Sequence, residues 1–208
     1  LEAGGQLPQG GFGQIEFTAI AQIGSDFAHH LRAIQTHPLE PVEIDQTLGP
    51  FRITGWLTDL YPEGRVTWRA GALKGADLIE LWIQHLVLNL LAPPGMAPQS
   101  IHLSYDTAQK NDPVRRTTFG PVTDAAAHLL GLLDLYWQGL TRPLPFFPET
   151  SLAWAKAAGT GKEEERARPV WTGGYLRHGE GEDPAYSFFF PATTLPLTAE
   201  FIALTALF

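Results

Sequence analysis

The segment Ile53-Thr54-Gly55-Trp56-Leu57-Thr58, the turn Tyr61-Pro62-Glu63-Gly64 and the segment Val66-Thr67-Trp68-Arg69 together decide the fold predicted for this chain. The first and last segments are rich in β-branched and aromatic residues, which favour strands. Proline followed by glycine is typical of a tight turn. We therefore predict a β-hairpin in which the strand 51–60 pairs with the strand 65–69.

Helices are predicted on both sides of this hairpin along the chain. Phe17, Ile20, Ile23 and Phe27 recur every three or four residues, which is the spacing of an amphipathic helix. Similar arguments place helices near 14–36, 77–91, 123–138, 149–158 and 198–208, further strands near 42–45, 101–105 and 116–119, and a mobile charged linker at 159–168. The predicted fold class is α/β, with a mixed central sheet flanked by the first three helices.

The composition is that of a folded globular protein. Hydrophobic residues make up 44% of the 208 residues and charged residues 17%, so we expect a single domain over residues 1–208. The absence of cysteine excludes disulfides and thiolate metal sites and favours a cytoplasmic location. No apolar run is long enough to span a membrane. Because the chain begins with Leu1 rather than Met, we expect it to be a fragment of a larger subunit.

The charge balance limits how the chain could contact nucleic acid. It carries 14 basic and 22 acidic residues, a net charge of −8, so any DNA contact must be local or shared with a partner. Lys110, Arg115 and Arg116 form a basic trio in a predicted polar loop. We predict that this trio touches a phosphate backbone, with a merely solvated loop as the alternative.

Several short motifs are weak signals. Gly159-Thr160-Gly161-Lys162 lacks the first glycine and the final hydroxyl residue of a phosphate-binding loop. The acids of His178-Gly179-Glu180-Gly181-Glu182-Asp183 could hold a metal ion, although a solvated glycine loop is the simpler interpretation. His29-His30 lacks a partner at a metal-binding spacing. No metal site is predicted.

The hairpin followed by a packed helix is the core unit of metal-dependent nucleases of the restriction-endonuclease type. Their chemistry needs one carboxylate on the first strand and an acid-x-lysine pattern on the second. Alternation along a strand then places the acid and the lysine on one face. The carboxylates hold Mg²⁺, which stabilises the charge that develops on the phosphate.

The hairpin resembles that of the helicase-associated nucleases, but the catalytic residues are replaced. In this comparison Thr58 and Thr67 take the places of the two aspartates, and Arg69 takes the place of the lysine. Leu78 and Trp82 occupy the Gln-x-x-x-Tyr positions of the following helix. Two hydroxyls cannot replace two carboxylates around a hard cation, and arginine cannot act as a base. The nearby acid, Asp59, is expected on the face opposite to Thr58.

These departures are similar to those of a known family. The chain resembles the nuclease-like carboxyl-terminal domain of the exodeoxyribonuclease V gamma subunit, the RecC family, over nearly its whole length. The matching stretches are Leu7–Gly13, Ile53–Leu57, Leu81–Leu86, Pro143–Thr150 and Gly179–Pro184. The resemblance implies a catalytically inactivated restriction-endonuclease-like (PD-(D/E)XK-type) fold at the carboxyl-terminal end of a larger subunit.

The resemblance also implies a function and partners. Gamma subunits are non-catalytic parts of a helicase–nuclease that processes double-strand breaks for recombination. The alpha and beta subunits supply the ATP- and Mg²⁺-dependent chemistry, and this domain would take no cofactor of its own while helping to split and guide the strands of forked DNA. Two alternatives remain: a structural scaffold that never contacts DNA, and an active nuclease that uses Glu16, Asp59 or another carboxylate from elsewhere in the chain. The phenylalanine stretches at 146–147 and 188–190 are predicted either to face partner subunits or to lie in the core.

Overall fold

The computed structural model describes residues 10–106, 113–175 and 177–208, and the chain divides into two compact units. The first unit comprises residues 1–73 and 84–125, and the second comprises residues 74–83 and 126–208. Helix α2 (Gly75–Leu91) begins in the second unit and ends in the first. The single nuclease-like domain expected over residues 1–208 stays a prediction.

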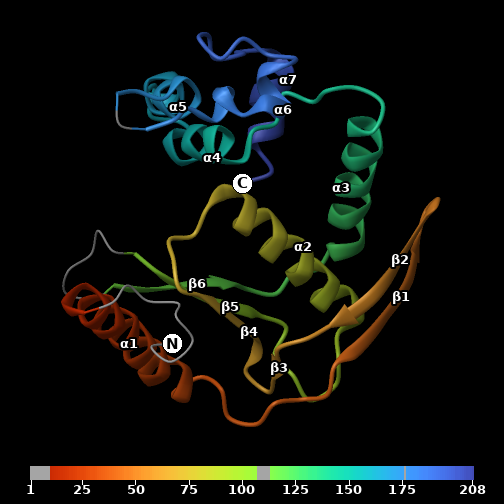
Figure 1. Cartoon of the computed structure of the whole chain (residues 1–208). Coiled ribbons are helices and arrows are strands. Elements are labelled where there is room, and N and C mark those ends of the chain that lie inside the picture. Colours follow the sequence, from red (N-terminus) through yellow and green to blue (C-terminus); the bar gives the residue numbers. More distant parts are fainter. Residues whose placement is uncertain (1–9, 107–112, 176) are drawn as a thin grey trace. The chain divides into compact units, whose positions relative to one another are not determined.

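The first unit contains a mixed four-stranded sheet with the order β3-β4-β5-β6. Strand β4 runs parallel to β5, and the other neighbouring pairs are antiparallel. The predicted mixed sheet in an α/β fold is therefore confirmed. Besides the end of α2, the unit contains α1 (Gly11–Arg32), β1 (Val42–Leu48), β2 (Phe51–Leu57), β3 (Leu60–Tyr61), β4 (Gly64–Arg69), β5 (Ser100–Tyr105) and β6 (Val114–Phe119) (Figure 1).

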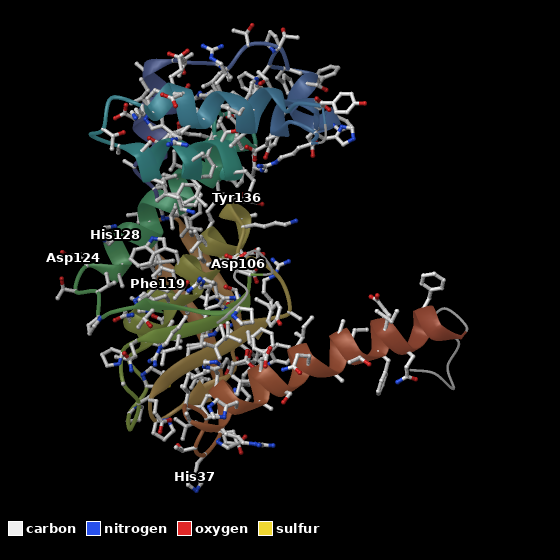
Figure 2. The ribbon with its side chains drawn as sticks, turned by 90° about the vertical axis from the view of Figure 1, so that its left-hand side faces the viewer. His37, Asp106, Phe119, Asp124, His128 and Tyr136 are labelled. Carbon is white, nitrogen blue, oxygen red and sulfur yellow. The ribbon has the colours of Figure 1, made fainter. Side chains whose placement is uncertain are left out.

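Helices α1 and α2 pack on opposite faces of this sheet. On one face, Phe27 of α1 lies with its ring centroid 5.4 Å from that of Trp68, and it belongs to a buried cluster with Leu103. On the other face, His85 of α2 hydrogen-bonds to Ser100. Ser100 and Leu103 are three positions apart on β5, so their side chains point to opposite sides of the sheet. In Figure 2, α1 extends from the sheet, and Asp106 marks the end where β5 leads toward β6.

The predicted long hairpin is wrong in its pairing. Strand β2 pairs along its whole length with β1, from Val42↔Leu57 to Leu48↔Phe51, and forms a separate two-stranded ribbon (Figure 1). Only the two residues of β3 pair with β4. The chain leaves the ribbon at Asp59, whose positive φ of 62° interrupts the extended backbone. The tight connection between β1 and β2 makes their pairing more local than the predicted one.

The second unit is helical and is built around aromatic residues. Phe147 is completely buried, and its ring centroid lies 4.3 Å from that of Trp171 and 6.1 Å from that of Phe201. Most of α3 belongs to this unit. Its elements are the start of α2, α3 (Ala125–Gly139), α4 (Pro148–Ala157), α5 (Glu163–Thr172), the short 3-10 helix η1 (Glu180–Glu182), α6 (Pro184–Ser187) and α7 (Ala199–Thr205).

One expectation for this unit needs correction. Residues 163–168 are not a mobile linker, because they form the first turns of α5, where Ala167 is buried. For Phe147, the core alternative holds, because its ring is completely buried in the aromatic cluster. Phe188 and Phe189 are exposed, so a partner contact for them stays a prediction. In the part of the chain that the structure describes, none of the helices combines the length and the apolar character that crossing a membrane requires.

Candidate nuclease-like site and basic pocket

Thr58 lies in the segment that joins the β1–β2 ribbon to the central sheet. Its side chain is exposed, and its hydroxyl donates a hydrogen bond of 3.0 Å to the Asp59 carboxylate. The expectation that Asp59 points away from Thr58 is therefore wrong, because the positive φ at Asp59 ends the strand alternation on which it depended. Arg65, almost fully buried, holds this bend by donating to the Thr58 carbonyl at 3.2 Å and approaching the Asp59 carboxylate at 3.7 Å.

Thr67 lies in the middle of β4 and is half-buried. It pairs in register with His102 of β5, and its hydroxyl oxygen lies 2.8 Å from the His102 Nδ1. His102 is buried, with 6% of its surface exposed. The residue aligned in sequence with the second metal-binding carboxylate of the nucleases therefore presents a hydroxyl that is bonded to an imidazole.

Thr67 belongs to a polar layer on the sheet face that packs against α2. We define this layer as Arg65, Thr67, His85, Ser100 and His102. Arg65 and Thr67 share one face of β4, and their register partners Ser100 and His102 share the same face of β5. No member of the layer is a carboxylate. Mg²⁺ prefers anionic oxygen ligands, so the layer offers it a poor environment.

His85 anchors α2 to this layer. The carbonyl of Gly120 can only accept a hydrogen bond, so the His85 Nε2, 2.8 Å away, carries the proton. The His85 Nδ1 then accepts from the Ser100 hydroxyl at 2.9 Å. Burial lowers the pKa of His85 below its usual value, and the hydrogen bond to Gly120 opposes this effect. The imidazole is therefore neutral near pH 7.

The Ser100–His85 contact brings together a hydroxyl and an imidazole that are distant in the sequence. Both residues are buried, with 3% and 0% of their surfaces exposed, so no substrate could reach the pair. The contact therefore holds the structure together rather than forming a nucleophile and its base. Periodicity could indicate that His85 is buried, but only the crossover from β4 through α2 to β5 sets it against Ser100.

The remaining nuclease positions lie on β4 and α2. Arg69 is the last residue of β4, half-buried, and pairs in register with Ser104. Leu78 and Trp82 lie in the part of α2 that belongs to the second unit, where both line an apolar pocket that also includes Tyr136 of α3. The ring of Trp82 contacts that of His128 on α3, with their centroids 6.1 Å apart.

The acidic loop after α5 uses its carboxylates to hold other elements. Glu180 accepts hydrogen bonds from the backbone N–H groups of Glu149 and Thr150 and so caps the start of α4. Glu182 lies 2.7 Å from the His178 Nδ1, and Asp183 caps α6. In the described ranges, no three His, Cys, Asp or Glu residues are grouped as metal ligands.

The basic trio predicted between two strands is only partly described. Lys110 lies outside the described residues. Arg115 and Arg116 are not in a loop, because β6 begins at Val114 and includes both. Both are exposed, and both line a pocket together with His29 and His30 of α1. The adjacent histidines gave no functional signal in the sequence, because the pocket depends on the packing of α1 beside β6.

Comparison with known proteins identifies the family of the chain. Residues 1–159 match the model of a family described as the RecC C-terminal domain. The chain is 29% identical over 200 residues to the RecBCD enzyme subunit RecC of Escherichia coli (strain K12), and this alignment covers 89% of the chain. The chain spans only 17% of the length of that relative. The resemblance predicted from the sequence is confirmed, and the chain belongs to the RecC C-terminal domain family.

Proposed function

We propose that this chain is a catalytically inactive, nuclease-like domain of the gamma subunit of a bacterial exodeoxyribonuclease V. In the assembled enzyme it would help to split and guide DNA strands and to hold the subunits together during double-strand break repair by recombination. The hydrogen bond of 2.8 Å between Thr67 and His102 carries this proposal, because a hydroxyl bonded to an imidazole occupies the position that aligns with a metal-binding carboxylate of the nucleases.

The order of elements in the first unit supports the restriction-endonuclease-like fold. Helix α1 is followed by the strands, and α2 then connects β4 to the parallel strand β5. This is the helix–strands–helix–strand order on which such nucleases build their site. In this chain the first metal-binding position, Thr58, falls at the bend between β2 and β3.

The chemistry of the enzyme would belong to other subunits. The relative is named a subunit of the RecBCD enzyme. By that likeness, the alpha and beta subunits would be the partners of this chain, and they would use the ATP and Mg²⁺. Forked duplex and single-stranded DNA would be its nucleic-acid partners.

The two alternatives make different predictions about DNA. A scaffold without DNA contact is favoured by the net charge of −8. This alternative is tested by measuring fork binding of the assembled complex over a range of salt concentrations. Each phosphate contact adds to the salt dependence, so a chain that makes no DNA contact would add nothing to it. An active nuclease would use Glu16, Asp59 or another carboxylate, and of these the Asp59 carboxylate is already engaged by Thr58 and Arg65. Metal-dependent cleavage of linear or forked DNA that is abolished by Asp59→Ala would overturn the proposal.

Restoring the missing carboxylates tests whether the positions have been assigned correctly. We expect the triple variant Thr58→Asp, Thr67→Asp, Arg69→Lys to bind Mn²⁺ in a calorimetric titration at concentrations where the parent chain does not. The new carboxylates would join that of Asp59 to supply anionic oxygens at one place. A folded triple variant that binds Mn²⁺ no better than the parent would contradict the assignment.

Exposed positions on three separate segments offer a matched control for this variant. Thr118→Asp, Thr193→Asp, Arg32→Lys makes the same three changes of residue type without grouping the new carboxylates, which lie in different units. The two triple variants have the same net charge, so non-specific attraction of cations is the same in both. Only the first should gain a defined site with a stoichiometry of one metal ion per chain.

A further inference from the structure

A pocket of about 410 Å³ lies between the end of α1 and strands β5 and β6, and the nuclease-like site does not use it. Its volume lies within the range of ligand sites, about 300–1,000 Å³. His29 and His30 contribute from α1, and Arg115 and Arg116 contribute from β6. No Asp or Glu is among the described residues that line it. This pocket is therefore a local basic site in an acidic chain.

The two arginines differ from others in how their charge is balanced. Arg52, Arg142 and Arg168 each contact a carboxylate. Within the described ranges, neither Arg115 nor Arg116 takes part in an ion pair or a side-chain hydrogen bond. Both side chains are exposed. Arg116 pairs with Leu103, so its side chain lies on the α1 face of β6 together with the pocket, whereas the side chain of Arg115 points to the opposite face. The Arg116 guanidinium can present a planar pair of N–H donors, the geometry that matches phosphate oxygens.

The pocket is fixed by the packing beneath it. Leu103 and Val114 line it, and both belong to the buried cluster around Phe27. On the α1 side, the rings of His29 and His30 contact each other edge to face, with centroids 5.7 Å apart. Because the core fixes the position of the residues that line the pocket, less conformational entropy is lost when a ligand binds.

The acid that precedes these histidines by one helical turn is already engaged. Asp26 accepts hydrogen bonds from the Tyr105 hydroxyl at 3.2 Å and from the Gln22 amide at 2.8 Å. These contacts direct its carboxylate to partners outside the residues that line the pocket. Asp26 therefore does not neutralise the arginines of β6.

We propose that this pocket binds a phosphate group of a nucleic-acid backbone, with Arg116 as the charged contact and His29 and His30 as additional N–H donors. This inference deepens the proposed function and rests on it for the choice of DNA as the source of phosphate. Backbone phosphates are the chemical group that exposed arginines and histidines recognise without regard to base sequence. The pocket would thus bind a strand without recognising its base sequence.

The test uses the 208-residue chain and three probes: a 12-nucleotide oligo-dT strand, a DNA duplex of the same length and inorganic phosphate. Binding is measured at several salt concentrations, and the ring resonances of His29 and His30 are followed by NMR. We expect Arg116→Gln to weaken oligonucleotide binding by about tenfold. The log–log salt dependence for the single strand should flatten by about 0.7, the value for one lost phosphate contact.

A control variant, Arg115→Gln, removes one positive charge from the same exposed stretch of β6, but from the face opposite to the pocket. It should bind both DNA probes as the parent does. The histidine resonances should move on adding oligonucleotide to the parent and to the control, but not to the pocket variant. Far-UV circular dichroism establishes that both variants are folded.

Three outcomes would overturn the inference: equal DNA binding by the two variants, histidine resonances that DNA does not move, or histidine resonances that move with inorganic phosphate but not with DNA. The last would identify a free anion rather than a backbone as the ligand. None of these results would affect the non-catalytic assignment, which the metal and cleavage experiments test separately. Conversely, cleavage by the chain would leave the phosphate pocket in place.

Discussion

Replacing Thr67 with valine isolates the hydrogen bond that distinguishes this site from a metal centre. Valine keeps the branched shape that suits a strand, and it exchanges only the hydroxyl for a methyl group. The bond to the His102 Nδ1 is 2.8 Å long, and His102 is buried with 6% of its surface exposed. Removing one partner of a buried polar group costs about 1–3 kcal/mol, and the new methyl group returns up to about 0.8 kcal/mol. We therefore expect a net loss of about 1–2 kcal/mol in the free energy of unfolding.

Urea denaturation measures this loss, and Thr54→Val is the matched control. Thr54 is an exposed strand residue of the β1–β2 ribbon, so the same exchange there should change the free energy by no more than about 0.5 kcal/mol. A double-mutant cycle with His102→Leu should give a coupling energy of about 0.5 kcal/mol or more between the two positions. A loss for Thr67→Val no larger than that for Thr54→Val, together with zero coupling, would refute the reasoning.

Two further predictions concern the core of each unit. Burial lowers the pKa of His85 from the usual 6.5, so the unfolded chain binds this proton more tightly than the folded one. The contribution of His85 to the free energy of unfolding should therefore have its full value above pH 6.5. Below pH 6.5 this contribution should decrease, by at most about 1.4 kcal/mol per pH unit. Urea titrations at several pH values should show this dependence diminished in His85→Gln, and an unchanged dependence would contradict it. In the second unit, Phe147→Ala removes a completely buried ring whose centroid lies 4.3 Å from that of Trp171. It should cost about 3–5 kcal/mol in the same assay, and a loss below about 1 kcal/mol would show that this ring does not hold the core together.

The local elements were largely predictable from the sequence because they depend on nearby residues. The apolar spacing around Phe27 gave α1, and the observed helix ends at Arg32. Helices α2, α3 and α4 were predicted to within two residues of their observed bounds. The turn at Tyr61–Gly64 was also found, since Gly64 has a φ of 125° and a Cβ there would overlap the Gln99 carbonyl oxygen.

Strand pairing was less predictable, because it depends on which segments meet in space. The strand pattern of β2 was clear, but the pattern does not say whether the partner precedes or follows it. The short turn between β1 and β2 and the bend at Asp59 decided that β2 joins the ribbon. The same bend turned Asp59 toward Thr58, which alternation along a continuous strand had excluded.

The sequence by itself determined which chemical groups the nuclease-like positions carry and to which family the chain is related, because both depend only on residue identity and order. Thr58, Thr67 and Arg69 lack the carboxylates of a metal site in any fold. Only the tertiary structure decided what surrounds them. The parallel pairing of β4 and β5 sets Thr67 against His102, and the packing of α1 beside β6 brings two histidines to the pocket that two arginines line. Such contacts join residues far apart in the chain, and no local spacing encodes them.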